Sequence, residues 1–515
     1  MNTLQEAVNL HAQGQFERAA ALYMQILEHE PRNADVMHLL GVAMLNDGHA
    51  ARAVEFLRNS IAINPSSVAA QANLARALQA TGNRKEALDH FDLAISAAPG
   101  NIEVLMDRGN LLAELNRMPE SLASFDAVLA INPAHVGALN NRGKILALLR
   151  RHQDALLALD AAIAQDPGFV PSWVNRGNVL TSLCRFDEAY ASFEHARAIA
   201  PDSPDVRWNA SFLKLLRGDF HTGWEDFEAR WAIPAFAQRR HVHLPVWQGD
   251  HDIRGKRVLL WYEQGFGDTL QFCRYAIMVA ALGAVVVLEV QPALKPLLAA
   301  SLRHAALVIA AGEPVPPCDF ALPLMSLPHA FRTDSSTVPY APAYLQADPV
   351  RVVEWEAKLG ARAQRLRIGV SFSGNVKHKS DMERSLNGAL FEPLARRADL
   401  FIVQKGLREA DASMLGELPG ARYLGDHLGD FSDTAAVIAN LDLVISVDTS
   451  LAHLAGALGK PVWVLLPASP DWRWQLDRDD SPWYPSARLF RQRQAGDWRE
   501  VIGRVVHALE GFEPV

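Results

Sequence analysis

The stretch VISVDTSLAHLAGALGKPVWVLL, residues 444–466, has the pattern of a strand, a helix and a second strand. An apolar strand ends at Asp448, a helix of small residues follows, and Gly459 to Pro461 return the chain to another apolar strand. Strands that alternate with helices are typical of a parallel sheet with both faces covered. The stretch therefore predicts an α/β fold for this part of the chain.

The same alternation reaches upstream to Trp247. Strands are expected at residues 257–262, 284–290, 366–372, 400–404, 442–447 and 461–466. A segment rich in proline and polar residues, about 328–349, separates two sets of strands. We therefore expect two doubly wound, Rossmann-like halves facing a cleft, at residues 238–350 and 351–515.

The N-terminal part of the chain is an internal repeat of 34 residues. Its markers are a proline column, a Gly/Ala column, a small-residue column and an aromatic or leucine column: Pro31, Pro65, Pro99, Pro133, Pro167 and Pro201; Gly41, Ala75, Gly109, Gly143 and Gly177; Ala19, Ala53, Ala87, Ser121, Ala155 and Ala189; Tyr23, Leu57, Phe91, Phe125, Leu159 and Phe193. These columns resemble the tetratricopeptide repeat, in which they are packing positions. Six regular repeats and a degenerate seventh predict an all-α superhelix over residues 1–237.

A further column of the repeat is polar. It comprises Asn73, Asp107, Asn141, Asn175 and, in the seventh copy, Asn209. In tetratricopeptide stacks this face lines the concave groove, where amides can pair with a peptide backbone whatever its side chains are. A similar asparagine ladder is known in O-linked N-acetylglucosamine transferases. Acceptor-peptide binding is one interpretation of the column, and a set of interhelix hydrogen bonds is the other.

Composition narrows the classes of partner. The 515 residues carry a formal charge of -8, so no overall basic field draws the chain onto nucleic acid or an anionic membrane. The three cysteines form no C-x-x-C pair, which indicates neither a disulfide framework nor a zinc site. The N-terminus lacks the pattern of a signal peptide, and no apolar run reaches the length of a membrane span. A cytoplasmic protein is expected.

Ligands of doubly wound domains bind beyond the carboxyl ends of the strands. The helix that follows Thr449 or Ser450 presents backbone N–H groups there, which form an anion site. A helix terminus contributes only about 0.3–1 kcal/mol, so cationic side chains must assist it. The candidates that would converge on this anion are Lys379, Arg384, Lys405 and His453. A dinucleotide site after the first strand is a weaker alternative, because GFGDTL lacks the third glycine of that motif.

Five motifs together resemble the glycosyltransferase family 9, or heptosyltransferase-like, domain that bacteria fuse to tetratricopeptide repeats. They are residues 261–275 (WYEQGFGDTLQFCRY), residues 371–385 (SFSGNVKHKSDMERS), residues 444–467, and the downstream DWRW and SPWYPSARLFRQ. The layout is also similar to O-linked N-acetylglucosamine transferases. The resemblance implies a GT-B fold, with an acceptor-side half followed by a half that binds a nucleotide-sugar.

The resemblance also implies roles for individual residues. Asp448, Thr449 and His453 match the motif that holds the nucleotide diphosphate, whereas Ser450 stands where heptosyltransferases usually have glycine. Asp268 matches the proposed catalytic base, and Glu263 is the substitute. The expected reaction inverts the anomeric centre without a metal or other cofactor. Gln404 is expected to contact the base or the sugar, and the tryptophan-rich segment 471–484 is either a stacking surface or a packed lid.

The repeats indicate a protein acceptor, and the expected class is flagellin or another surface protein modified before export. Transfer to a lipopolysaccharide or other glycan acceptor is an alternative that the heptosyltransferase likeness favours. A scaffold with a degenerate transferase domain is a third. The sequence leaves the sugar, the nucleotide, the acceptor and the oligomeric state open.

Overall fold

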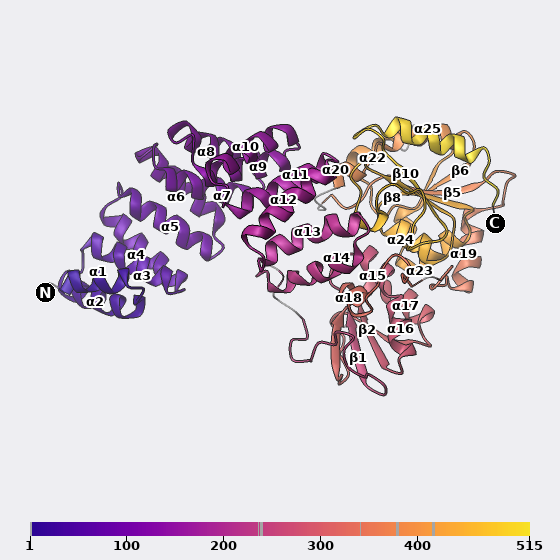
Figure 1. The fold of residues 1–515 in the computed structure, drawn as a ribbon, viewed down its shortest axis with the longest axis horizontal. Helices are drawn as coiled ribbons and strands as arrows, with labels where there is room; N and C mark the ends of the chain where they lie inside the picture. The colour runs from indigo at the N-terminus through magenta and orange to yellow at the C-terminus, as the bar shows by residue number, and fades with distance from the viewer. Residues whose placement is uncertain are drawn as a thin grey trace. The chain divides into compact units, whose positions relative to one another are not determined.

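The computed structural model describes residues 3–234, 236, 240–339, 341–376, 381–414 and 418–514. The chain forms two compact units, Met1–Ala200 and Pro201–Val515. Each unit is described by itself below, with helices and strands labelled as in Figure 1.

The first unit is a succession of antiparallel helix pairs (Figure 1). Its helices are α1 (Thr3–Ala12), α2 (Phe16–His29), α3 (Ala34–Asn46), α4 (Ala50–Ile63), α5 (Val68–Ala80), α6 (Arg84–Ala97), α7 (Ile102–Glu114), α8 (Met118–Ile131), α9 (Val136–Leu148), α10 (His152–Gln165), α11 (Val170–Ser182) and α12 (Phe186–Ile199). The tetratricopeptide architecture that the 34-residue period predicts is confirmed.

The packing columns of the repeat work by close contact between the two helices of a pair. A methyl group at Gly41 would lie 2.6 Å from Cγ of Leu57, and one at Gly109 would lie 2.7 Å from the ring of Phe125. Both larger partners are buried. Because cores are close-packed, only glycine lets the second helix approach this near at these two positions. The repeat therefore buries an apolar stripe in every pair at the same spacing.

The second unit begins with one more helix pair, α13 (Pro204–Leu216) and α14 (Phe220–Phe227), followed by the 3₁₀ turn η1 (Glu228–Ala232). The sequence groups this pair with the repeats, whereas the structure divides the chain between Ala200 and Pro201. The reason lies in aromatic packing: Trp224 meets Trp472 edge-on at 5.1 Å, and Phe220 meets Trp483 at 6.3 Å. These contacts join the pair to the α/β part of the chain.

The first half of the α/β part is a four-stranded parallel sheet with the order β3-β2-β1-β4. Its elements are β1 (Arg257–Trp261), α15 (Phe266–Phe272), α16 (Tyr275–Ala281), β2 (Val285–Val290), η2 (Pro292–Leu294), α17 (Lys295–Ser301), β3 (Ala306–Ala310), β4 (Phe320–Pro323), η3 (Leu324–Ser326) and α18 (Leu327–Ala330). The strand order reverses between β1 and β4, so a crevice opens at the carboxyl ends of these two strands.

The second half is a six-stranded parallel sheet with the order β10-β9-β8-β5-β6-β7. Its elements are α19 (Pro349–Leu359), β5 (Arg367–Ser371), α20 (Asp381–Arg384), η4 (Gly388–Phe391), α21 (Glu392–Ala395), β6 (Asp399–Ile402), α22 (Glu409–Met414), β7 (Arg422–Tyr423), η6 (Gly425–His427), α23 (Phe431–Ala439), β8 (Leu443–Val447), α24 (Ser450–Ala457), β9 (Val462–Leu466), η7 (Trp472–Trp474), β10 (Ala487–Arg491) and α25 (Trp498–Leu509). Here the order reverses between β5 and β8.

The predicted fold class, a tetratricopeptide superhelix followed by an α/β domain, is confirmed. All six predicted strands exist within one or two residues of their expected bounds, and β3, β4, β7 and β10 were not predicted. In the described part of the chain, no helix combines the length and apolarity needed to cross a bilayer.

Buried contacts hold the two sheets of the second unit together. Arg274 donates to the Trp483 carbonyl at 2.7 Å and to the Tyr344 hydroxyl at 2.9 Å. The amides of Tyr344 and Leu345 donate to the Ala457 carbonyl at 3.0 and 3.1 Å. Helix α15 of the first half packs against α24 of the second. The carboxyl-end loops of the two halves therefore meet.

Candidate active site

Two crevices define the candidate site, one at each point where the strand order reverses. The crevice between β5 and β8 is lined by the described parts of the loops that follow these strands, Ser373 to Val376, Asp381 to Ser385 and Asp448 to His453. The crevice between β1 and β4 is lined by the loop from Glu263 to Asp268. The loops that carry Arg384, His453 and Asp268 therefore lie at switch points.

The first turn of α24 is open to an anion. Thr449 is its N-cap in extended conformation, but its side chain makes no capping bond and pairs with Ser446 Oγ at 3.1 Å. The amides of Ala452 and His453 donate back to the Thr449 carbonyl, whereas no acceptor among the described residues faces the amides of Ser450 and Leu451. Two N–H groups at the positive end of the helix are thus available.

His453 lies inside this site as a neutral side chain. It is 5% exposed, its Nδ1 lies 2.8 Å from the Tyr484 hydroxyl, and its ring stacks on Trp474. Burial, together with the charge of Arg473, holds the pKa of His453 well below its ordinary value of 6.5. Its Nε2 lies 3.8 Å from Asp448. His453 therefore supplies no positive charge at neutral pH.

Asp448 holds a proton more tightly than an ordinary aspartate. Burial raises the pKa of Asp448 to about 6, and the charge of Asp471 adds to the effect, while Arg384 and Arg473 oppose it. A carboxyl with a perturbed pKa in a crevice is a mark of a functional site.

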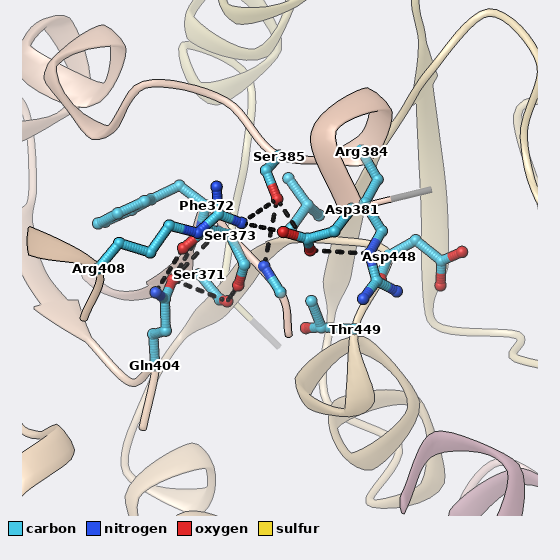
Figure 2. A network of polar contacts seen from close by, with 12 residues as sticks. Ser371, Phe372, Ser373, Asp381, Arg384, Ser385, Gln404, Arg408, Asp448 and Thr449 are labelled. Carbon is cyan, nitrogen blue, oxygen red and sulfur yellow. Dashed lines mark hydrogen bonds and ion pairs between the residues drawn. The ribbon is translucent and has the colours of Figure 1, made fainter. Parts of the chain in front are cut away.

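Two arginines from neighbouring loops share one buried carboxylate beside Asp448 (Figure 2). Asp381 accepts from Arg408 and from Ser385 Oγ, and its Oδ1 lies 3.4 Å from Arg384 Nε. Arg384 also donates to the Asp448 carbonyl at 2.8 Å. The predicted donor residue Arg384 is thus placed at the start of the α24 turn.

The side-chain amide of Gln404, just after β6, forms hydrogen bonds within the protein. Its Oε1 accepts from the amides of Ser373 and Phe372 at 3.1 and 3.3 Å, and its Nε2 donates to Ser373 Oγ and to the Gly406 carbonyl (Figure 2). The side chain is 7% exposed. The amide oxygen and nitrogen of Gln404 therefore connect the loop after β6 to the loop after β5.

The hydrogen bond of Lys405 lies outside this network. Its Nζ donates to the Gly429 carbonyl at 2.8 Å, at an exposed position. Lys379, another predicted donor residue, lies outside the described residues.

Asp268 lies at the start of α15, against α24. Its Oδ2 accepts from the Gly265 amide at 2.8 Å, and its Oδ1 is ion-paired with Arg473. A methyl group at Gly267 would lie 2.8 Å from Cδ2 of His453, so the first turns of the two helices are in contact. The candidate base and the candidate anion site are therefore neighbours.

Glu263 occupies a different environment in the same loop. It is ion-paired with buried Arg230 at 3.1 Å and accepts from the Met325 amide at 3.2 Å. Burial raises the pKa of Glu263, and the charge of Arg230 opposes the shift. Glu263 thus links η1 to β1 and η3, which favours a structural role over that of a substitute base.

The tryptophan-rich segment is packed. Trp472, Trp474, Trp483 and Tyr484 are each 3% exposed or less. Their rings contact one another and the ring of Trp224. Of the two interpretations of this segment, the packed lid agrees with the burial.

The polar column of the repeats forms hydrogen bonds between helices. Arg76 donates to Asn73 at 2.9 Å and to Asp107 at 2.7 Å, and Asn73 Nδ2 lies 2.8 Å from His38 Nε2. These side chains are half-buried.

The column continues in later repeats. Asn141 donates to Asn110 at 3.0 Å, and Asn175 donates to Asn140 at 2.9 Å. Asn209, in the second unit, donates to a carbonyl of its own helix at 2.8 Å. Of the two interpretations of the column, interhelix hydrogen bonds describe Asn73, Asp107, Asn141 and Asn175 in the absence of a peptide.

Sequence reasoning assigned no role to Asp381, Arg408, Asp471 or Arg473. Asp381 and Arg408 follow β5 and β6, so their place after predicted strands was the available signal. Arg473 follows β9 by seven residues and contacts Asp268, more than 200 residues earlier. No local pattern predicts that contact.

Comparison with known families agrees with this architecture. Models of the tetratricopeptide repeat match residues 10–59, 45–106 and 106–169, and the model described as glycosyltransferase family 9 (heptosyltransferase) matches residues 429–500. The chain fuses tetratricopeptide repeats to a glycosyltransferase family 9 domain. In this fusion, the matched part of the transferase domain contains α23, β8, α24 and the tryptophan-rich segment.

Individual proteins resemble parts of this fusion. Protein FlbA of Caulobacter vibrioides is 29% identical over 343 residues, which cover 61% of this chain and 57% of that protein. The chain therefore spans less than two thirds of that relative. A tetratricopeptide repeat protein from Parabacteroides merdae is 16% identical over 45% of this chain and 92% of its own, with a TM-score of 0.41. YrrB, a repeat protein with an unusual peptide-binding site, is 21% identical over 36% and 95%, with a TM-score of 0.32.

Proposed function

We propose that the chain is an inverting, metal-independent glycosyltransferase that moves a sugar from a nucleotide-sugar to a hydroxyl of a protein acceptor held by the repeats. The observation that carries the proposal is the contact between the first turns of α15 and α24, which carry the carboxylate of Asp268 and the open amides of α24. An anion site beside a base is what displacement of a diphosphate by a hydroxyl requires.

In the proposed reaction, Asp268 accepts the proton of the acceptor hydroxyl. The hydroxyl oxygen forms a bond to the anomeric carbon while the bond from that carbon to the diphosphate oxygen breaks. Attack comes from the face opposite the leaving group, so the configuration inverts. The electron pair of the broken bond leaves with the diphosphate.

The leaving diphosphate is stabilised by groups that are already in place. The amides of Ser450 and Leu451 point to it from the helix terminus, and Arg384 adds a guanidinium charge at the same turn. Preorganised donors of this kind stabilise developing charge without reorganisation. Neutral His453 supports α24 through Tyr484 and Trp474, and Lys405 reaches the site only if it leaves Gly429.

The proposed acceptor is a polypeptide because the amide column of the repeats offers hydrogen bonds that do not depend on side chains. A glycan acceptor is the alternative that the heptosyltransferase description of the matching family favours. Incubation of the full chain and a donor with a bacterial protein extract or with lipopolysaccharide, followed by mass analysis, separates the two.

The first test is donor binding. Thermal unfolding of the full chain is measured with a panel of nucleoside diphosphates and nucleotide-sugars, because a ligand at 100 times its dissociation constant stabilises the fold by about 2.7 kcal/mol. At least one donor should raise the melting temperature. A panel without any shift would favour the scaffold alternative.

A backbone variant tests the anion site itself. Ser450 is the first helical residue of α24 and Thr449 before it is extended, so proline fits there and removes one N–H. Ser450→Pro should weaken nucleoside diphosphate binding about tenfold, roughly one hydrogen bond to a charged group. The matched control Ser450→Ala keeps the N–H and should bind within about threefold of wild type. Equal affinities for both variants would place the diphosphate elsewhere.

A further inference from the structure

Arg473 connects the two halves of the second unit at the candidate base. It lies in η7 of the second half, and its side chain is 9% exposed. One guanidinium nitrogen pairs with Asp268 of α15, and Nε donates to Gln271 of the same helix at 2.7 Å. Nη1 donates to Asp471 at 2.9 Å. A single buried guanidinium therefore joins a carboxylate from each half.

This pairing fixes the orientation of the Asp268 carboxylate. One oxygen faces Arg473, and the other accepts from the Gly265 amide. With a donor on each oxygen, rotation of the carboxylate breaks one charge-assisted hydrogen bond. The remaining lone pairs are presented in a fixed direction, and a general base needs a fixed direction toward the proton that it accepts.

Arg473 is itself held by the helix pair α13–α14. Its guanidinium stacks on the ring of Trp472 at 4.3 Å. Trp472 meets Trp224 of α14 edge-on at 5.1 Å. Trp224 is 2% exposed, so its ring is fixed by packing on both sides. The order of contacts is thus Trp224, Trp472, Arg473, Asp268.

The same region also anchors the other end of the loop that carries the base. Arg230, in the 3₁₀ turn that follows α14, pairs with Glu263 and donates to Ser326 Oγ at 2.7 Å. Arg473, which the helix pair holds, pairs with Asp268, and Arg230, in the turn directly after the pair, pairs with Glu263. Both carboxylates of this loop are therefore held by arginines.

We propose that Arg473 is a positioning residue that orients Asp268, and that the helix pair α13–α14 is part of the catalytic unit because it holds Arg473 through Trp224 and Trp472. The proposal rests on the proposed function, since it assigns Asp268 the role of base. The degenerate seventh repeat thereby acquires a role that differs from that of the six regular repeats.

The first arm of the test needs no donor. Hydrogen exchange of the full chain is measured by mass spectrometry for Arg473→Met, Arg473→Lys and Trp224→Ala. Peptides that cover residues 263–272 should exchange about tenfold faster in Arg473→Met, and less so in Arg473→Lys, because lysine keeps the charge but not the fork. Trp224→Ala should speed exchange in this segment and in residues 471–475. Arg396→Met is the control, because Arg396 is exposed and pairs with Glu392 in the same half, away from both segments.

The second arm measures turnover with the donor that the binding panel identifies. Arg473→Met should lower kcat about 100-fold, the loss expected from a misplaced catalytic group, and leave stabilisation by the nucleoside diphosphate unchanged. Arg473→Lys should recover part of the loss. If Arg473→Met does not fold, Arg473→Lys and Trp224→Ala carry the test.

The outcomes separate this proposal from the proposed function. Unchanged exchange in residues 263–272, or an unchanged kcat in a folded Arg473 variant, would overturn the positioning role. Faster exchange in a chain whose wild type consumes no donor would support the orientation of Asp268 by Arg473 and contradict the proposed function.

Discussion

The repeat unit and the α/β unit hold their polar side chains in different ways. In the repeats, the amide column is half-buried and mostly neutral, and its members pair with polar side chains of neighbouring helices. In the α/β unit, Arg230, Arg473, Asp381 and Glu263 are buried charges that form ion pairs with side chains of other elements. A neutral hydrogen bond contributes about 1 kcal/mol, whereas a buried charge that loses its partner costs several times more. Substitutions should therefore act very differently in the two units.

The largest effect is expected for Asp268→Asn. Asparagine keeps the shape of the side chain but cannot accept the hydroxyl proton, so sugar transfer should fall at least about 1,000-fold while donor binding changes little. Product formation by mass analysis and thermal shift with the nucleoside diphosphate measure the two quantities. A transfer rate above a tenth of wild type would contradict the assignment of the base.

A large effect on stability is expected for Glu263→Gln. The substitution leaves buried Arg230 without one of its two carboxylates, so the free energy of unfolding should fall by about 2–3 kcal/mol. Eleven of the 12 tryptophans lie in the second unit, so their fluorescence during chemical denaturation follows that unit.

The control for this prediction is Glu313→Gln, which changes an exposed carboxylate paired with Lys295 in the same unit. Its unfolding midpoint should stay near that of wild type, since exposed pairs contribute little. If Glu263→Gln were as mild as its control and abolished transfer, Glu263 would be the base instead.

The pH dependence of stability sharpens the contrast further. The pKa of Asp448 is raised to about 6 in the folded chain from 3.8, so the folded state keeps its proton where the unfolded state loses it. The proton on Asp448 adds about 3 kcal/mol to the free energy of unfolding below about pH 4. This stabilisation is lost as pH rises to about 6. His453 has the opposite sign, because its lowered pKa makes stability fall as pH drops below 6.5.

The variant Asp448→Asn isolates the aspartate. The difference in unfolding free energy between the variant and wild type should grow in favour of the variant from pH 4 to pH 6.5, as measured by chemical denaturation. The same difference at both pH values would mean that Asp448 titrates normally.

The smallest effects are expected in the amide column. Asn141→Ala and Asn175→Ala should each lower stability by about 1 kcal/mol or less, raise KM for a protein acceptor severalfold, and leave donor hydrolysis unchanged. Gln165→Ala, at an exposed helix end, is the control. An unchanged KM in the double variant would contradict peptide binding by this column and strengthen the glycan alternative.

The sequence predicts best what is local or periodic. The 34-residue period predicts each helix pair of the repeats, because close packing demands a small residue at positions such as Gly41 and Gly109 in every copy. Apolar runs predict the central strands of both sheets, whereas β4 contains a proline and β7 has two residues, so neither has a recognisable pattern.

What the sequence does not predict depends on distant contacts. The seventh helix pair keeps the repeat pattern, yet Trp224 faces Trp472, about 250 residues later. Gln404 follows a strand as a ligand residue would, but its amide joins the loop after β5. His453 occupies the expected turn of α24, and only the packing of Tyr484 and Trp474 shows that it is buried and neutral. Position after a strand thus predicts the place of the site better than the role of each residue.

The central claim is that the first turn of α24 binds the diphosphate of a nucleotide-sugar. A crystal soaked with the nucleoside diphosphate that gives the largest thermal shift tests it most directly. Phosphate oxygens are expected within hydrogen-bond distance of the Ser450 and Leu451 amides, with Arg384 beside them. Phosphate bound elsewhere, with these amides facing only solvent or protein, would contradict it.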